Sequence, residues 1–529
     1  MRVAFAYPTN RTALLKAVLK GKDPDNALYG YNYIVKEDKY LCEVSQTAER
    51  ILNLFFYPIS LIFLKQIDID FKLARAILMI SKLNKADVIV SNIDGMSLAI
   101  CFLKRLKLVR ALLVYSVGLF YIQGKLDTAL ESKRETLFLK FYKWILTAAD
   151  QILYHSPIEK EKLKRLKIYN PETCTFVPMG SDNIFFNLTK FRRTEPKETL
   201  VVSVGKDRAR DYKTLLLSAA MLPSFKFIVV CRKDNIAGLK IPKNVEIYFE
   251  LQYQEVAALY QKSTIAVIPI REMNRSSGQM TLTDSIQTKI PIIISNVVGI
   301  SHYPLKDGFN VIKVPPQNPK LLKEAIEKLI KDKSLQSKLI KNSQSLARQY
   351  TTKRYAQDLA AIINSALDLI KLKPVDRDDI EFMRRIRNEN RNFFISRQIL
   401  SRKDQQRWFE NYRKKDNDFT YIFKKADKRL GVGSIYNINN NKRNANIGRF
   451  VIDKTFQNQG YGKILLRKIE QIGFDKMGME TLNLEVLSDN ISAIKLYKQA
   501  GFIKQKDTIR SGKKVTIMIK HENSPILAV

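Results

Sequence analysis

The sequence predicts an α/β protein in which two doubly wound domains in tandem precede a smaller domain of mixed α+β type. Short apolar runs typical of buried strands alternate with helical patterns over residues 1–185 and again over residues 186–371. The polar segment "KLKPVDRDD" then resembles a linker, and a hairpin pattern appears in residues 375–521. A chain of 529 residues is long enough for three domains of ordinary size.

The first domain opens on "RVAFAYP", an apolar run typical of a buried strand, and the runs "ADVIVSN", "ALLVYSVG" and "DQILYHSP" follow with helical patterns between them. This alternation favours a parallel sheet with helices on both faces. The most apolar run, Ile51–Leu64, is interrupted by Pro58 and is shorter than the roughly 20 residues that cross a bilayer. Two interpretations stay open for it: a buried helix, or a helix that lies on a membrane surface.

The second domain begins after "TCTFVPMGSDNIFF" (Thr173–Phe186), where Pro178 and Gly180 interrupt the alternation. The run "TLVVSVG" (Thr199–Gly205) restarts it, and "FKFIVVC", "TIAVIPI" and "IPIIISN" are the next predicted strands. A long helical region closes the domain.

The third domain begins with two predicted helices, Asp378–Glu389 and Ser401–Arg413. A hairpin follows, in which "YIFKKADKRLGVGSIYNI" turns at "NNNKRN" into "ANIGRFVID". The pattern ends with a glycine loop and its helix, the strand "TLNLEVLS", the helix "SAIKLYKQAG" and the strand "KVTIMIK".

The glycine loop has the pattern Gln457-x-x-Gly460-x-Gly462 and runs directly into a helix. A helix N-terminus offers unpaired N–H groups and a partial positive charge, and glycine lets a diphosphate approach that backbone closely. The loop alone also fits an ordinary strand–helix turn. Its context adds weight, because Asn490 follows the next strand and Tyr497 precedes Gly501-Phe502.

Together these residues resemble the GNAT acetyltransferases over roughly residues 375–520. The resemblance implies acetyl-CoA as co-substrate, with the pantetheine arm along one strand and the pyrophosphate on the loop amides. The residues implied in binding are Val451, Ile452, Gln457, Asn458, Gln459, Gly460, Tyr461, Gly462, Lys463 and Asn490.

The same resemblance implies two catalytic residues. Tyr497 matches the general acid of the family, and Glu485 matches a base that acts through water in several members. Arg387, Asn388 and the pair Trp408-Phe409 resemble segments of two acceptor classes: enzymes that acetylate nucleotide-linked amino sugars, and enzymes that acetylate protein N-termini.

The tandem domains resemble the GT-B glycosyltransferases, in which a cleft lies between the carboxyl ends of two sheets. Pro178, Gly180, Asp182 and Phe186 match their interdomain pattern. The resemblance implies that residues 1–185 bind the acceptor and residues 186–371 bind a nucleotide-sugar donor, with cations on the diphosphate and an aspartate on the ribose. The donor-binding residues implied are Gly205, Lys206, Arg208, Lys213, Gly278, Gln279, Thr281 and Asp284.

One departure concerns the donor sugar. Retaining members of this group have two glutamates separated by seven residues, and here Ser276 and Asp284 occupy these positions. A GT-B half that binds a glycan without transferring it therefore remains an alternative to an active transferase.

Composition limits the other classes of function. The net charge of +38 suits phosphate-bearing ligands or an anionic membrane, but no zinc-finger spacing or stacking pattern indicates nucleic acid. Four scattered cysteines and three histidines predict no metal site and fit a reducing, cytoplasmic location, with contact at the inner membrane face left open. The working hypothesis is a bifunctional enzyme of surface-glycan assembly.

Overall fold

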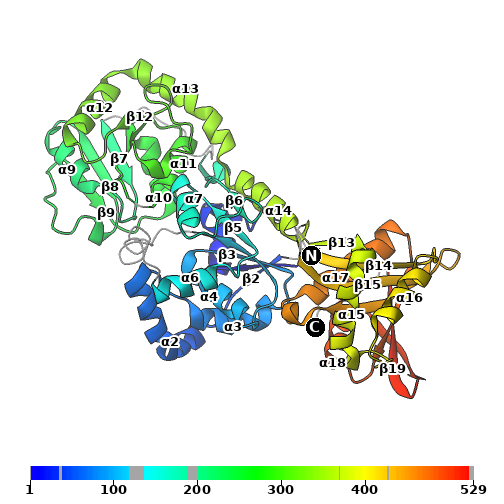
Figure 1. Cartoon of the computed structure of the whole chain (residues 1–529). Coiled ribbons are helices and arrows are strands. Elements are labelled where there is room, and N and C mark those ends of the chain that lie inside the picture. Colours follow the sequence, from blue (N-terminus) through cyan, green and yellow to red (C-terminus); the bar gives the residue numbers. More distant parts are fainter. Residues whose placement is uncertain are drawn as a thin grey trace. The chain divides into compact units, whose positions relative to one another are not determined.

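The computed structural model of the chain describes residues 2–34, 39–117, 136–186, 199–273, 275–368, 370–425 and 428–522. Its contacts divide the chain into two compact units, Met1–Asn364 and Ser365–Val529 (Figure 1). The predicted fold class is confirmed, because the first unit contains two parallel sheets and the second contains one mixed sheet. The predicted domain boundaries near residues 185 and 371–375 stay predictions.

The first sheet has the strand order β2-β1-β3-β4-β5-β6, and all its pairings are parallel. Its strands are β1 (Val3–Ala6), β2 (Lys39–Cys42), β3 (Val88–Asn92), β4 (Leu112–Ser116), β5 (Gln151–Tyr154) and β6 (Cys174–Phe176). Its helices are α1 (Thr12–Leu19), α2 (Gln46–Ile67), α3 (Leu73–Leu83), α4 (Asp94–Arg105), α6 (Leu137–Leu146), α7 (Pro157–Arg165) and the short α8 (Asn183–Phe186).

The second sheet has the order β12-β11-β10-β7-β8-β9, again with parallel pairings. Its strands are β7 (Leu200–Val204), β8 (Lys226–Val230), β9 (Val245–Tyr248), β10 (Ile265–Ile268), β11 (Ile292–Ser295) and β12 (Ile312–Val314). Its helices are α9 (Tyr212–Ala220), α10 (Tyr253–Lys262), α11 (Gln279–Gln287), α12 (Pro319–Lys331), α13 (Lys333–Gln349) and α14 (Thr352–Asp368).

Both faces of the second sheet are covered, as its continuous apolar strands predict. Val201 and Val267 enter one apolar core, while their chain neighbours Val202 and Ile268 enter another. Because successive strand residues point to opposite faces, these two cores lie on the two sides of the sheet. Strand order reverses between β1 and β3 in the first sheet and between β7 and β10 in the second. Ligands of such sheets bind at these switch points, beyond the carboxyl ends of the strands.

The second unit is a seven-stranded sheet of order β13-β14-β15-β16-β17-β19-β18, in which the β16–β17 pairing is parallel and the other pairings are antiparallel. Its strands are β13 (Ile370–Pro374), β14 (Asp418–Lys425), β15 (Lys428–Asn439), β16 (Asn444–Ile452), β17 (Thr481–Leu487), β18 (Ile503–Arg510) and β19 (Lys513–His521). Its helices are α15 (Ile380–Glu389), α16 (Arg402–Tyr412), α17 (Tyr461–Gln471) and α18 (Ile491–Gln499).

Two expectations need correction. The segment around Pro374 is not a linker, since Ile370–Pro374 pairs antiparallel with β14 as the edge strand of the second unit. An edge position tolerates Pro374, which cannot donate a hydrogen bond to a further strand. The apolar run at Ile51–Leu64 is not a buried helix either: it belongs to the 22-residue helix α2, which continues through Pro58 and buries only Phe63 and Ile67.

Candidate functional site

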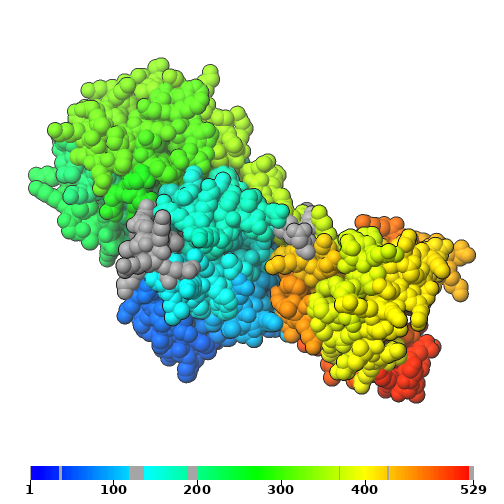
Figure 2. All heavy atoms as spheres, in the orientation of Figure 1, coloured from blue at the N-terminus to red at the C-terminus, as the bar shows by residue number. Residues whose placement is uncertain are grey.

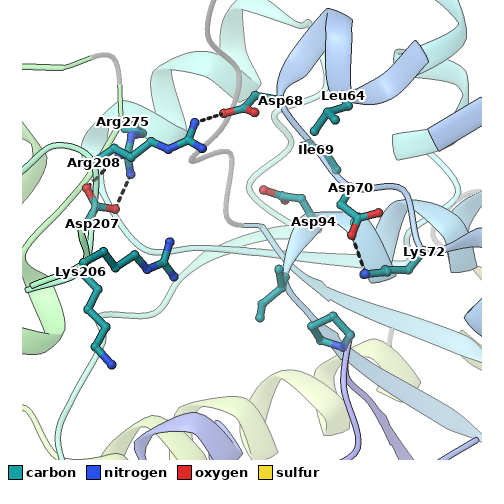
Figure 3. A pocket seen from close by; sticks show the side chains of 14 residues that line it. Leu64, Asp68, Ile69, Asp70, Lys72, Asp94, Lys206, Asp207, Arg208 and Arg275 are labelled. Carbon is teal, nitrogen blue, oxygen red and sulfur yellow. Dashed lines mark hydrogen bonds and ion pairs between the residues drawn. The ribbon is translucent and has the colours of Figure 1, made fainter. Parts of the chain in front are cut away.

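Two neighbouring cavities in the first unit are lined by residues that follow the carboxyl ends of strands in both sheets. The larger, of about 500 Å³, is lined by Pro8 after β1, Asp94 after β3 and Arg208 after β7 (Figure 3). The smaller, of about 310 Å³, shares Lys206 and Asp207 with it. Both cavities therefore lie at the switch points where parallel sheets bind ligands.

The strongest feature of the smaller cavity is Arg210, which the sequence reasoning missed. Its side chain is buried, with 4% of its surface exposed, and Nη2 donates to Thr281 Oγ1 at 2.6 Å. Its Nε and Nη1 atoms have no hydrogen-bond partner among the described residues. A buried guanidinium with unpaired donors is costly unless a ligand satisfies it, and a planar fork of donors suits a phosphate.

Gly205 lines the smaller cavity and also makes room for Arg210, which the sequence did not indicate. A Cβ atom placed on Gly205 would lie 2.1 Å from Arg210 Nε, so the missing side chain makes room for the guanidinium. The glycine thus brings Arg210 to the end of β7. In the sequence, Arg210 stands directly before Asp211, which caps α9, and only its burial distinguishes it from the other cations of this segment.

Gly278 and the first turn of α11 complete the floor of this cavity. Gly278 caps α11 with φ of 82°, and a Cβ atom there would lie 2.4 Å from Ile270 Cδ1, so glycine is required. Gln279 and Thr281, which the resemblance implies in donor binding, line the cavity, with the positive end of the helix dipole behind them. Gln279 also donates from Nε2 to the backbone oxygen of His155 at 3.0 Å, across to the first sheet.

Asp207 holds the loop that carries these cations. It accepts two hydrogen bonds from Arg275, at 2.7 and 2.8 Å, and one from Ser277 Oγ at 3.0 Å. Burial alone would raise the pKa of Asp207, but the hydrogen bonds and charge of Arg275 outweigh it and hold the pKa below its ordinary value. The loop between β7 and α9 is therefore tied to the segment before α11.

The other predicted donor residues differ in position. Lys206 lines both cavities, and Arg208 lies in the larger one, paired with Asp68 at 3.4 Å. Lys213 is exposed on α9 and lines neither cavity. Asp284 accepts hydrogen bonds on Oδ1 from Asn26, at 2.9 Å, and from Ser181, and burial raises its pKa to about 7.

Ser276, which stands where a glutamate was expected, has a carboxyl group beside it. Its Oγ donates to Glu159 Oε1 at 2.9 Å, and Glu159 Oε2 accepts from the backbone N–H of His155 at 2.5 Å. Glu159 comes from α7 of the other sheet and is buried. Burial raises its pKa to about 8. A carboxyl group thus reaches this position from a residue that is 117 places away in sequence.

This pKa predicts how stability depends on pH. The folded pKa of Glu159 is about 8 and the ordinary value is 4.5, so the folded state holds a proton that the unfolded state has lost. Stability is therefore expected to rise as the pH falls from 8.5 to 6.5, with about 2 kcal/mol from Glu159 and a further part of the same sign from Asp284. Burial lowers the pKa of His155 and His302 from 6.5 to about 4, so both histidines begin to oppose this trend near pH 6.5, at the lower end of this range, and oppose it more strongly below.

Thermal unfolding of Glu159→Gln at these two pH values checks the assignment. The gain in Tm on acidification is expected to be smaller than in the wild type, whereas Glu161→Gln, an exposed position on the same helix, should keep the full gain. An unchanged pH dependence in Glu159→Gln would show that this carboxyl group is ionised in the folded protein.

The second unit contains a separate candidate site where β16 and β17 part. These parallel strands pair only over Asn444–Asn446 and Thr481–Asn483, although β16 continues to Ile452 and β17 to Leu487. Beyond the pairing, β16 bonds only to β15, and Val451 and Ile452 pair with Val432 and Gly431 there. The separation leaves backbone groups of β16 available to an extended ligand such as the pantetheine arm expected for these residues.

The glycine loop lies at the open end of this gap. Asn458 and Gly460 adopt φ of 61° and 80°, and Gly460 caps α17. Within the described residues, the backbone N–H groups of Asn458, Gln459, Gly460 and Gly462 have no acceptor, while Lys463 N–H donates to Gly460. The loop is half-exposed, so these groups are open to a ligand. Gln457 fixes the loop, since its Nε2 donates to Asn390 Oδ1 and to the oxygen of Ile452.

Two tyrosines and one glutamate lie near the same gap. Tyr497 on α18 is buried, with its ring 6.3 Å from that of Phe450 on β16, and burial raises its pKa well above the ordinary value. Glu485 on β17 pairs with Arg510 at 3.3 Å. Tyr436 on β15, which the sequence did not indicate, lies near both: burial raises its pKa, the charge of Arg449 lowers it and the charge of Glu485 raises it further. A protonated phenol and a carboxylate are the groups that amine acetylation requires.

The remaining predicted residues have local partners. The Asn490 side chain caps α18 by accepting from Ala493 N–H at 3.2 Å, and Asn388 bonds both N–H and oxygen of Leu400 at 2.9 Å. Arg387 stacks on Phe394 at 3.9 Å and donates from Nη2 to the oxygen of Ser396, while its buried Nη1 has no partner in the described part of the chain.

Two known protein families match the chain, one in each of the two units that contain the candidate sites. The profile of the group 1 glycosyl transferases matches residues 187–346, and that of the acetyltransferase (GNAT) family matches residues 383–502. An uncharacterized glycosyltransferase of Methanocaldococcus jannaschii is 22% identical over 235 residues, which make up 43% of this chain and 63% of that protein. The chain thus spans less than two thirds of the length of this relative.

Solved acetyltransferases resemble the second unit at low identity. The spermidine N-acetyltransferase of Vibrio cholerae in complex with CoA and spermine is 18% identical, with a TM-score of 0.28, over 30% of this chain and 98% of that one. A dodecameric structure of spermidine N-acetyltransferase from the same organism is also 18% identical, with a TM-score of 0.26, over 29% and 95%. Identities and TM-scores this low give no information about the substrate of this chain. With the two family matches, the chain combines a group 1 glycosyltransferase region with a C-terminal GNAT acetyltransferase domain.

Proposed function

We propose that the first unit transfers a sugar from a nucleotide donor. The observation that supports this most strongly is Arg210, a buried guanidinium with two unpaired donor atoms beside the N-terminus of α11. Together with Lys206, these groups form a cationic site of the size and chemistry of a diphosphate. The donor would then lie at the switch point of the second sheet, and the acceptor would enter from the larger cavity.

The contact between Ser276 and Glu159 favours an active transferase over a binding module. A chain that had lost catalysis would have no need to retain a carboxyl group at the position of the missing glutamate. Here a buried carboxyl from α7 is hydrogen-bonded to the serine that replaces it. We infer that Glu159 positions Ser276 against the donor sugar. The binding module stays the alternative, and release of nucleotide from a donor separates the two.

Asp284→Ala tests the proposed ribose contact. Loss of the carboxylate is expected to weaken nucleotide-sugar binding about tenfold, because a ribose hydroxyl would lose its acceptor. Binding is measured by calorimetry with UDP-sugars and GDP-sugars. Ser181→Ala is the matched control, since it removes the hydrogen bond from Ser181 but keeps the carboxylate. An Asp284→Ala protein that binds the donor as tightly as the wild type would reject the ribose assignment.

We propose that the second unit transfers an acetyl group from acetyl-CoA to an amine. The observation that supports this most strongly is the gap between β16 and β17. It opens onto a loop whose backbone N–H groups are mostly without an acceptor among the described residues. In this proposal the loop binds the pyrophosphate, β16 binds the pantetheine arm, and Tyr497 protonates the departing thiolate. Glu485 accepts the amine proton through water.

We further propose that both reactions serve surface-glycan assembly in the cytoplasm. Successive steps on one pathway gain effective concentration when their enzymes are tethered in one chain, and an amino sugar would link the two chemistries. The charge of +38 suits nucleotide sugars, CoA and lipid diphosphates. The alternative acceptor for the acetyl group is a protein N-terminus.

Labelled acetyl-CoA offered with amino-sugar nucleotides, free amino sugars, peptide N-termini and spermidine identifies the acceptor class. The expected result is label on an amino sugar. Label on peptides alone would reject the amino-sugar proposal. In parallel, release of UDP or GDP from a panel of sugar donors tests the first unit, and no release from any donor with any glycan acceptor would favour the binding module.

A further inference from the structure

The helix α2 presents an unusually apolar outer surface. Leu54 and Phe55 are 77% and 74% exposed, and Leu137 at the start of α6 is 85% exposed. The two helices lie side by side, because the Phe63 ring is 5.5 Å from that of Phe138. Together they form what is called here the apolar face: Ile51, Leu54, Phe55, Tyr57, Ile59 and Ile62 of α2 with Leu137, Phe141 and Trp144 of α6. Figure 2 shows the blue atoms of the region of α2 on the visible surface of the molecule.

An apolar face of this extent needs a partner, since soluble proteins seldom expose several large apolar side chains together. By length and composition α2 could cross a membrane. Only 6% of its apolar window is buried in the protein, so α2 is not a core helix. Both ends of α2 are tied to the first sheet. Glu49 near its start pairs with the buried Arg75 of α3 at 2.6 Å, and Phe63 and Ile67 near its end are buried.

These ties exclude a spanning helix. The strand β2 precedes α2 and pairs with β1, and α3 follows α2 and packs in the same apolar core as β1 and β3. A spanning helix would place β2 and α3 on opposite sides of a bilayer, which one sheet cannot accommodate. The helix can therefore meet a membrane only by lying along its surface, with its apolar side inserted.

The charges around the apolar face favour an anionic lipid surface over a second protein. Glu49 is the only acidic residue in α2 and α6, and it is paired with Arg75. Arg105 stacks on Trp144 at 5.7 Å, so a cation lies beside an exposed aromatic ring. Asp68 and Asp70 beyond α2 are paired with Arg208 and Lys72. Arg50 and Lys65 of α2 and Lys140 of α6 are exposed on the helices that form the face, and within the described residues no ion pair involves them.

We propose that the apolar face of α2 and α6 docks the protein onto an anionic bilayer, with Tyr57 and Trp144 at the headgroup level. Tryptophan and tyrosine favour this level, and basic residues near the surface attract anionic lipid. Leu64 at the end of α2 also lines the larger cavity. If the proposed glycosyl transfer is correct, docking brings the cavity to the membrane surface, where a lipid-linked acceptor would enter it.

Vesicle sedimentation with the full chain and no substrate tests docking independently of either proposed activity. Vesicles of phosphatidylglycerol and phosphatidylcholine are expected to bind the wild type, and vesicles of phosphatidylcholine alone at least tenfold more weakly. Leu54→Ser with Phe55→Ser should lower binding at least tenfold without lowering Tm, because both side chains are exposed. Ile503→Ser with Ile509→Ser, exposed isoleucines of β18, is the matched control and should bind as the wild type does.

A second pair tests the charges. Arg50→Gln with Lys140→Gln is expected to weaken binding to the anionic vesicles several-fold and to reduce its sensitivity to salt. The proposal is overturned if the wild type does not sediment with anionic vesicles, or if Leu54→Ser with Phe55→Ser binds them as tightly as the wild type. It is also overturned if light scattering shows a wild-type dimer that this double variant dissociates while vesicle binding is unchanged.

Discussion

Arg210→Ala is expected to lower kcat/KM for glycosyl transfer at least 100-fold. Removing one preorganised donor to a developing negative charge costs about 10²- to 10³-fold in comparable sites, and here the donor is a buried cation with two unpaired N–H atoms. Binding of UDP and GDP, measured by calorimetry, should weaken along with the rate. Arg210→Lys is expected to recover part of the loss, because it restores the charge but not the planar fork.

The control for this prediction is Lys213→Ala. Lys213 is a cation three residues further along the chain, but it is exposed on α9 and lines neither cavity. Its removal should leave both rate and nucleotide affinity within about twofold of wild type, as for most surface changes. Equal losses in the two variants would mean that overall positive charge, and not the buried guanidinium, attracts the donor.

Tyr497→Phe is expected to lower acetyl transfer at least tenfold while CoA still binds. Burial raises the pKa of Tyr497, so its hydroxyl stays protonated across the physiological range and can donate a proton to the thiolate. The change removes one oxygen atom and keeps the ring against Phe450 and Phe502, so the fold should persist. Turnover is followed by release of free CoA, and CoA affinity by calorimetry.

Tyr436→Phe is the companion variant. Tyr436 lies on β15 close to Glu485 and Arg449, and it is a second phenol near enough to Tyr497 to affect its pKa. If Tyr497 is the acid, Tyr436→Phe should retain most of the activity. A loss confined to Tyr436→Phe would transfer the role of acid to Tyr436, and full activity in both variants would remove a phenol from the mechanism.

Much of the fold could be predicted because its pattern is local. The strands Val88–Asn92 and Ile292–Ser295 are buried along their whole length, and each begins with a run of three apolar residues. The loop at Gly460 could be found for a related reason. A positive φ at the start of a helix favours glycine, and that preference is visible in a few neighbouring residues. The caps of α16 and α18, at Ser401 and Asn490, are local features of the same kind, because each side chain bonds a backbone N–H in the first turn of its own helix.

The sequence by itself thus indicated the two α/β regions, the α+β region, the two transferase families and the glycine loop at Gly460, because each depends on spacing within one element or one turn. Only the tertiary structure decided that Arg210 is the buried one among the cations that follow β7. The same holds for the contact of Glu159 with Ser276 and for the exposed position of α2. Burial depends on what packs against a residue. The partners concerned lie 71 and 117 residues away along the chain, at distances where periodicity carries no information.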